Sequence, residues 1–365
     1  MAKAKLTVGD MVNSGKKDTK KSTNDFNLNE LDEFLGGISP NEGWKPTRYL
    51  KINDALEKAL NHPEGIIQHG HTYLFVGHSD TGKTTALIES AKACQRDGVL
   101  PIFLISELKW DFDHLYNSGF DLIKTDIVDE ETGEVTVKYT GKFLYRDAET
   151  ALVSIESTAE FINKCLKAQR DGHIKQDICF FIDSLGNIRS EQSINANKKS
   201  NLWDAGAIAS QFLRGVCKDI NLTRKKGLPY FATLIIVNHA TINPHINEFM
   251  ASPTLDPLGG QSLVKASTGI IQFGDVTKAG TAKVKATKGG KEIIFGKRTK
   301  VKLTKYHGSD VTTDGKIILT EHGFIEDDKM AIKEYTKKHS KNWVKTFGSD
   351  DFDIVDEDDG KELDD

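Results

Sequence analysis

Residues 77–84 read Gly-His-Ser-Asp-Thr-Gly-Lys-Thr, and this stretch decides the fold. It fills every fixed position of the phosphate-binding loop pattern Gly-x-x-x-x-Gly-Lys-Ser/Thr. An apolar run, residues 72–76, precedes the loop, and a helical pattern follows it from Thr84. Strand, loop and helix in this order are the context that the pattern requires. We therefore predict a P-loop that binds a nucleoside triphosphate, within an α/β fold.

Each fixed position of the loop has a chemical reason. Gly77 and Gly82 let the backbone curl so that its N–H groups face phosphate oxygens, and the dipole of the following helix adds to the attraction. We predict that Lys83 reaches the β- and γ-phosphates of ATP and that the Thr84 hydroxyl binds Mg²⁺. The residues predicted to bind the nucleotide are Gly77, His78, Ser79, Asp80, Thr81, Gly82, Lys83, Thr84 and Thr85.

The composition is that of an ordinary soluble protein, with 38% hydrophobic and 28% charged residues in a chain of 365. No apolar run approaches the roughly 20 residues of a membrane span, and the N-terminus lacks the apolar segment of a secretory signal. The four cysteines are widely spaced, which favours reduced core thiols over disulfides or a metal site. We expect a cytoplasmic protein.

The net charge of −4 conceals a strong asymmetry. Residues 349–365 hold ten acidic side chains and one lysine, so this tail carries −9 and residues 1–348 carry about +5. Residues 278–305 contain ten basic side chains and a single acidic one. A nucleic acid suits such a basic cluster, and the tail could compete for it. A solvated charged face and a solubilising tail are the open alternatives.

The chain divides by composition into four segments. Residues 1–45 are predicted to be a flexible segment with a short amphipathic helix and a linker, and residues 46–325 the ATPase core. Residues 326–348 are predicted to be a short helical segment, and residues 349–365 the acidic tail.

Apolar strand-like runs alternate with helical patterns in the core, which predicts a mostly parallel sheet. The strands are expected at residues 72–76, 101–106, 178–183 and 233–238, and the helices at residues 84–96 and 152–169. We expect the strand at 101–106 to lie beside the P-loop strand. A small hairpin is expected around Gly133, and β-type runs at 301–306 and 316–320 predict an antiparallel edge.

Polar residues at the ends of these strands extend the predicted site. Asp183 ends an apolar strand about a hundred residues after the P-loop, where a carboxylate can hold magnesium through water. Glu107 can orient or deprotonate the water that attacks the γ-phosphate, unless it only opens a helix. Asn238 and His239 end another strand, where His239 can sense the γ-phosphate or can be a satisfied core histidine.

Two long polar stretches, residues 186–202 and 240–263, also leave strands of this sheet at one edge. Structureless segments of this length are usually functional or disordered.

These motifs together resemble the RecA family of recombinases, and within it the phage branch of UvsX-type recombinases. The resemblance covers residues 51–325. Its most specific part is Phe-Ile-Asp-Ser-Leu-Gly-Asn at residues 181–187, supported by Val-Asn-His at 237–239 and Ile-Ser-Glu at 105–107. The hairpin near Gly133 and the first 45 residues match nothing in the family.

The resemblance implies a RecA-like fold and a DNA-dependent ATPase that polymerises as a helical filament on single-stranded DNA. The filament pairs this strand with homologous duplex DNA for recombination and repair, and it hydrolyses ATP at subunit interfaces. A mediator and a single-strand-binding protein are implied partners, in a phage-encoded protein of the bacterial cytoplasm. The residues implied to bind DNA, in the two polar stretches, are Arg189, Lys198, Lys199, Phe249, Met250, Gly259 and Gly260.

The resemblance also assigns residues that would complete the nucleotide site. Lys305 would reach the γ-phosphate bound to a neighbouring subunit, whereas His307 stands where a second such cation is expected. His114 stands where the family has a tyrosine that stacks on adenine, and Tyr116 is the nearby alternative.

Two other classes of protein remain open. A hexameric replicative helicase of the DnaB type shares the P-loop and both carboxylates, but the motif at residues 181–187 and the lack of a large helical N-terminal domain count against it. A non-catalytic, ATP-gated DNA-binding scaffold is the third class. A scaffold needs no hydrolytic carboxylate, so Glu107 and Asp183 count against it.

Overall fold

The computed structural model describes residues 43–106, 110–128, 132–147, 154–191, 194, 214–243, 254–257, 261–275, 281–288, 291–307 and 313–339. The chain divides into two compact units, Met1–Trp44 and Lys45–Asp365. The helices and strands given below belong to the second unit. The predicted N-terminal helix and the acidic tail lie outside the described residues, so the four-segment division stays a prediction.

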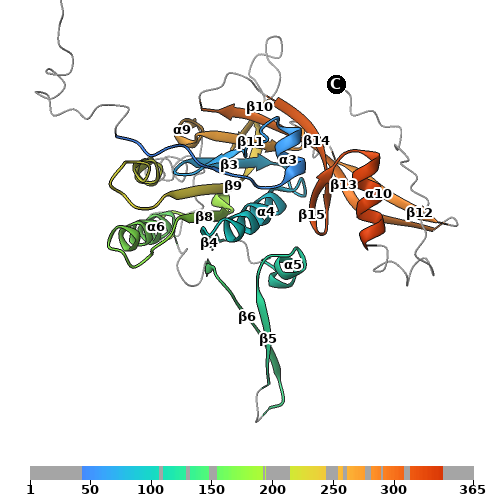
Figure 1. Cartoon of the computed structure of the whole chain (residues 1–365), viewed down its shortest axis with the longest axis horizontal. Helices are drawn as coiled ribbons and strands as arrows, with labels where there is room; N and C mark the ends of the chain where they lie inside the picture. The colour runs from blue at the N-terminus through green and yellow to red at the C-terminus, as the bar shows by residue number, and fades with distance from the viewer. Residues whose placement is uncertain are drawn as a thin grey trace, which may run out of the picture. The chain divides into compact units, whose positions relative to one another are not determined.

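A large mixed sheet forms the centre of the second unit (Figure 1). Its main path runs in the order β15-β14-β13-β11-β3-β9-β8-β4-β7. The strands from β11 to β7 pair in parallel, and the strands from β13 to β15 pair antiparallel. The bounds are β3 Thr72–Gly77, β4 Leu100–Ile105, β7 Leu144–Asp147, β8 Ile178–Asp183, β9 Ala232–Asn243, β11 Gly269–Phe273, β13 Lys291–Tyr306, β14 Thr313–Thr320 and β15 Gly323–Glu326. The predicted α/β class, with an antiparallel edge, is confirmed.

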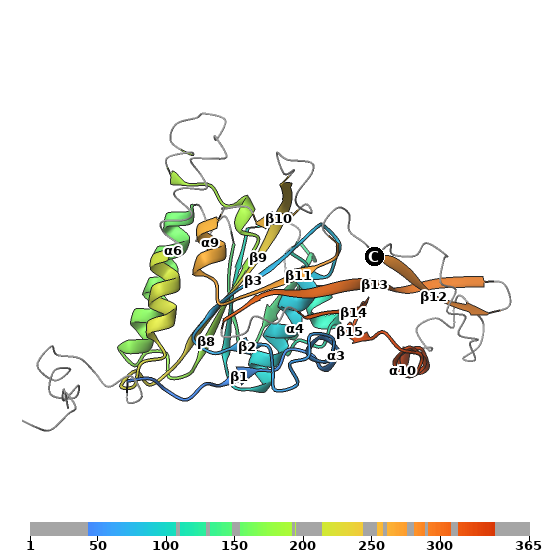
Figure 2. The same cartoon turned by 90° about the horizontal axis from the view of Figure 1, so that it is seen from above.

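Helices cover both faces of the parallel strands, as Figure 2 shows. One face carries α3 (Asp54–Ala59) and α4 (Lys83–Arg96), which bury Phe75 and its neighbours. The other face carries α6 (Ile155–Arg170), the helical residues 214–222 and α9 (Gln261–Ala266), which bury Leu74 and its neighbours. Because successive side chains alternate between faces, a strand buried on both must be apolar throughout. Burial on both faces therefore explains the continuous apolar runs in the sequence.

The helix boundaries follow local signals. α4 ends at Arg96 with Asp97 as its C-cap, followed by Gly98 with φ 71°, as the Asp-Gly pair predicts. α6 begins three residues later than predicted, because the Ser154 side chain accepts a hydrogen bond from the backbone of Ser157 and caps the helix there. Among the described residues, no helix combines the length and the apolarity of a membrane span. All four cysteines are buried and free.

The antiparallel edge extends into a two-stranded ribbon that α10 (Lys329–His339) covers. β12 (Ala282–Lys288) pairs with β13, and their common buried face contributes Val284, Ala286 and Phe295 to a small cluster under α10. A second ribbon consists of β5 (Ile123–Val128) and β6 (Val135–Thr140), which pair with each other and with no other strand of the described ranges. The hairpin predicted around Gly133 is thereby confirmed, with longer strands than expected. Short strands β1 (Tyr49–Leu50) and β2 (Ile67–Gln68) form another antiparallel pair.

Two expectations about the sheet are wrong. The strand predicted at 101–106 is β4, which pairs with β8 and β7, so β8 and β9 separate it from the P-loop strand β3. Two intervening strands place β4 about 14 Å from β3. The stretch 240–263 is also not structureless, because β9 continues to Asn243 and pairs with β10 (Thr254–Pro257) as a hairpin, followed by α9. The β-branched residues Thr241 and Ile242 favour this extension of the strand.

Candidate functional site: a glycine-rich loop at the carboxyl ends of the parallel strands

The predicted P-loop joins the end of β3 to the start of α4, as expected. Gly77, Asp80 and Gly82 all have positive φ, at 154°, 59° and 102°. A Cβ atom at Gly77 would collide with the backbone carbonyl oxygen of Phe273 on the neighbouring strand β11. Glycine is therefore required at position 77 both by backbone conformation and by the close approach of β11.

The first turn of α4 has no side-chain cap. Its N-cap is Gly82, which offers no side chain to accept hydrogen bonds from the helix N–H groups. Such N–H groups, together with the positive end of the helix dipole, favour negative charge. The helix end therefore fits a phosphate group.

Two side chains close over the loop. The buried Lys83 donates from Nζ to the backbone carbonyl of His78 at 2.5 Å, and Thr81 donates from Oγ1 to the same carbonyl at 2.8 Å. His78 is half-buried, whereas Ser79 and Asp80 are exposed at the tip of the loop. The ammonium group therefore already lies against the loop that is predicted to hold phosphates.

Thr84 and Asp183 meet at the base of the loop. The Thr84 hydroxyl donates a hydrogen bond of 3.0 Å to Oδ2 of Asp183, which is buried at the end of β8. Hydroxyl and carboxylate oxygens are ligands that Mg²⁺ accepts, usually alongside water and phosphate oxygens. The described residues contain no group of three or more His, Cys, Asp or Glu side chains arranged to hold a metal ion. A magnesium ion here would thus depend on nucleotide and water for most of its ligands.

The strand register aligns the other predicted residues along this edge. His239 lies directly opposite Gly77 in the β3–β9 ladder, and Asp183 lies opposite Ile105 in the β4–β8 ladder. His239 is half-buried, and its neighbour Asn238 is fully buried. Glu107 lies outside the described residues, two positions beyond the end of β4.

Ser106 is a residue of this edge that the sequence did not single out. Its hydroxyl donates to the carbonyl of Ser184 at 2.7 Å and accepts from the backbone N–H of Ser184 at 3.1 Å. Both bonds tie the chain just after β4 to the chain just after β8. Ser106 therefore fixes the backbone immediately before Glu107. The only sequence signal was its place in the motif Ile-Ser-Glu.

The two predicted DNA-binding stretches leave the same edge, because they follow the parallel strands β8 and β9. Arg189 is exposed after the short 3-10 helix η1 (Leu185–Asn187). The β9–β10 hairpin continues beyond His239, with Ala240 opposite Pro257. The remaining residues predicted to bind DNA, namely Lys198, Lys199, Phe249, Met250, Gly259 and Gly260, lie outside the described residues.

Lys305 lies away from the P-loop of its own chain. It pairs with Ile270 of β11, which in turn pairs with Leu74 of β3, three residues before Gly77. Its Nζ donates to the carbonyls of Val264, Lys265 and Ser267 at 2.7, 3.3 and 2.5 Å. The ammonium group thus caps the C-terminal end of α9, and burial lowers the pKa of Lys305.

The two residues proposed to stack on adenine lie on α5 (Phe112–Asn117), which follows β4. His114 is half-buried and Tyr116 is exposed. The exposed ring of Tyr116 is the more accessible surface for stacking.

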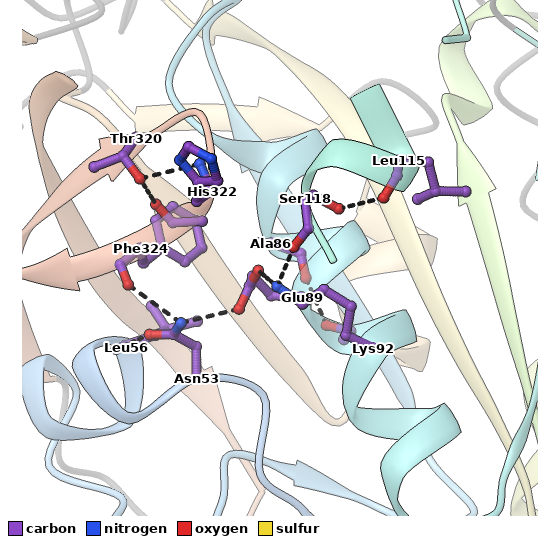
Figure 3. A network of polar contacts seen from close by, with 12 residues as sticks. Asn53, Leu56, Ala86, Glu89, Lys92, Leu115, Ser118, Thr320, His322 and Phe324 are labelled. Carbon is purple, nitrogen blue, oxygen red and sulfur yellow. Dashed lines mark hydrogen bonds and ion pairs between the residues drawn. The ribbon is translucent and has the colours of Figure 1, made fainter. Parts of the chain in front are cut away.

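A network of polar contacts holds α4 to the elements around it (Figure 3). The carboxylate of the buried Glu89 accepts hydrogen bonds from Nζ of Lys92 at 2.6 Å and from Nδ2 of Asn53 at 2.9 Å. Lys92 also donates to the carbonyl of Ser118 after α5, and Asn53 to the carbonyl of Phe324 in β15. The helix α4 is therefore bonded directly to the N-cap residue of α3 and to the chain just after α5, and through Asn53 to β15.

Comparisons with known proteins add no assignment: no protein-family model matches the chain, and no curated protein matches it.

Proposed function

We propose that this chain is an ATP-dependent recombinase that forms helical filaments on single-stranded DNA and pairs that DNA with a homologous duplex. One observation carries the proposal: the candidate nucleotide site and the candidate DNA-binding segments lie at the same carboxyl ends of the parallel strands. The P-loop, Asp183 and His239 lie at the same end of the parallel strands from which the β9–β10 hairpin and the stretch after β8 extend. A single edge can couple nucleotide binding to DNA binding.

The described residues would divide the work at the nucleotide as follows. The N–H groups at the start of α4 and the Lys83 ammonium bind phosphate oxygens. Thr84 and Asp183 would hold magnesium, which would supply positive charge to stabilise the phosphate oxygens. His239, opposite Gly77, lies where it can respond to the γ-phosphate. Glu107 is proposed as the general base, on a backbone that Ser106 fixes.

The DNA side of the proposal rests on charge and on exposed structure. Arg189 is exposed beside the start of α6, where its carbonyl accepts a hydrogen bond from Ile155. Basic side chains and backbone N–H groups bind DNA phosphates, and such binding weakens as salt concentration rises. The proposal that residues 186–202 and 240–263 are DNA-binding loops comes from the resemblance to the RecA family.

Electron microscopy of the full chain with single-stranded DNA and a non-hydrolysable ATP analogue tests the proposal. Helical filaments whose formation requires both ligands are the expected result. Closed hexameric rings would favour a helicase instead. ATP hydrolysis should also rise when single-stranded DNA is added. Assembly on DNA without any hydrolysis would favour the ATP-gated scaffold.

A further inference from the structure

The turn that joins β14 to β15 lies against the start of α4. A Cβ atom added at Gly82 would lie 3.2 Å from Cε1 and 3.5 Å from Cζ of Phe324, the second residue of β15. The same atom would lie 3.6 Å from Cδ2 of Leu319 in β14. The buried ring of Phe324 therefore occupies the space beside the N-cap residue of α4.

The turn also contacts α4 further along the helix. A Cβ atom at Gly323, where φ is 116°, would lie 2.5 Å from Oε1 of Glu89. The Phe324 carbonyl accepts a hydrogen bond of 3.3 Å from Asn53, which also donates to Glu89 at 2.9 Å (Figure 3). Gly82 and Glu89 are seven residues apart, so they lie on the same side of α4. The turn is thus held against two successive turns of the helix.

Phe324 connects the second glycine of the loop to the first. Its ring stacks on the ring of Phe273, with 6.2 Å between the centroids and an interplanar angle of 16°. The backbone carbonyl oxygen of Phe273 would lie 2.2 Å from a Cβ atom at Gly77. The Phe273–Phe324 pair therefore contacts both fixed glycines of the loop, one through a carbonyl group and the other through a ring.

We infer that Phe324 is a positioning residue of the P-loop, which holds Gly82 so that the first N–H groups of α4 face the phosphates of a bound nucleotide. Gly82 needs such support because glycine is the residue with the greatest backbone freedom. Its φ is 102°, and its carbonyl accepts the hydrogen bond from Ala86 that opens the helix, at 2.9 Å.

The positioning role has a measurable consequence for affinity. Without the ring beside Gly82, the empty loop would populate conformations that do not bind phosphate. The apparent dissociation constant rises in inverse proportion to the fraction of molecules that are competent to bind. The inference rests on the nucleotide-binding part of the proposed function and requires neither DNA nor filaments.

Isothermal titration calorimetry of the full chain with a non-hydrolysable ATP analogue and Mg²⁺ tests the inference. Phe324→Leu keeps an apolar side chain but removes the ring. It should raise the dissociation constant about tenfold, which corresponds to a competent fraction of about one tenth. Wild-type affinity in this variant would overturn the inference.

Phe295→Leu is the matched control. It removes another buried ring from the antiparallel edge, one that stacks on Tyr335 in the cluster under α10. This variant should bind the analogue as tightly as the wild type, and equal weakening in both variants would overturn the inference. Urea denaturation of both variants verifies that they are folded under the conditions of the titration.

A second substitution covers the case in which Phe324→Leu does not fold. Leu319→Ala removes the half-buried side chain that also lies beside Gly82, and it should weaken binding of the analogue. Unchanged affinity would then overturn the inference. The expected affinities without filaments on single-stranded DNA would sink the proposed recombinase and leave the positioning role standing. A wild-type chain that does not bind the analogue would overturn both.

Discussion

The hydroxyl of Thr84 donates a hydrogen bond of 3.0 Å to the carboxylate of Asp183. This bond joins the first turn of α4 to the end of β8, although β9 lies between β8 and the P-loop strand. A hydroxyl and a carboxylate at this separation can both reach one magnesium ion. Thr84 and Asp183 together are therefore the proposed magnesium-binding pair of the site.

Lys83→Ala should lower ATP hydrolysis by a factor of about 10²–10³, because the variant loses the cation that is proposed to face the transferred phosphate. Phosphate release with and without single-stranded DNA measures the effect. Lys164→Ala is a suitable control, since this lysine is paired with Glu160 on the exposed side of α6. Undiminished hydrolysis by the Lys83 variant would remove the P-loop from the mechanism.

Thr84→Val and Thr84→Ser separate the hydroxyl from the shape of the side chain. The valine variant should need much more magnesium for half-maximal ATP hydrolysis, since it offers no oxygen to the ion. The serine variant keeps the hydroxyl and should stay within a few fold of the wild type. Magnesium titrations of ATP hydrolysis give the comparison, and equal magnesium dependence in both variants would contradict the metal assignment.

Lys305→Ala tests whether a neighbouring subunit completes the site. Alone, this variant and Lys83→Ala should both be inactive in DNA-stimulated hydrolysis. An equal mixture should regain activity, because about a quarter of head-to-tail interfaces then combine an intact P-loop with an intact Lys305. A mixture as inactive as its components would mean that Lys305 only caps α9, where it binds three carbonyls.

Glu89→Ala should destabilise the fold by about 3 kcal/mol, because it leaves Lys92 and Asn53 without their shared acceptor in a buried network. Glu89→Gln keeps one acceptor oxygen and should cost less. Urea denaturation measures the free energy of unfolding, with Glu160→Ala as the exposed control. Equal stability of both Glu89 variants and the wild type would show that the network contributes nothing.

Acidification should weaken the fold through His71. Burial, then the nearby Arg224 and His307, lower the pKa of His71 from 6.5 to about 4. In the unfolded chain His71 therefore takes up a proton near pH 6.5, whereas in the folded chain it does so only near pH 4. Stability from this residue is complete above pH 6.5 and is lost as pH falls toward 4, by up to about 3 kcal/mol.

Two hydrogen bonds of the imidazole ring explain why His71 is neutral in the folded chain. Arg224 donates to Nε2 of His71 at 2.8 Å, so Nδ1 carries the proton and donates to Oγ1 of Thr268 at 2.9 Å. His71→Gln can keep both hydrogen bonds without titrating. Its urea midpoint should depend less on pH between 7.5 and 4.5 than that of the wild type, and identical pH profiles would contradict the assignment.

The sequence predicted the strands and helices of the core because burial on both faces leaves a continuous apolar run, and because Gly77 and Lys83 sit in an unambiguous pattern. It did not predict that β4 lies three positions from β3. Strand order depends on pairings between distant segments, such as Ile105 with Asp183, which no local pattern records.

The capping of α9 by Lys305 and the support that Ser106 gives to the edge were also out of reach of the sequence. Both depend on side chains that meet backbone groups far along the chain, in hydrogen bonds that leave no periodic signal. A serine and a lysine at those positions have many uses. Only the fold selects one of them.

The position of β3 has a consequence for synthesis of the protein. Its two neighbours are β9, which begins at Ala232, and β11, which ends at Phe273. A nascent chain that stops before Ala232 contains the P-loop but lacks both strands that flank β3. Pairings between segments so far apart in the sequence form late in folding. Because Phe273 also shapes the turn at Gly77, nucleotide binding should distinguish a completed chain from a truncated one.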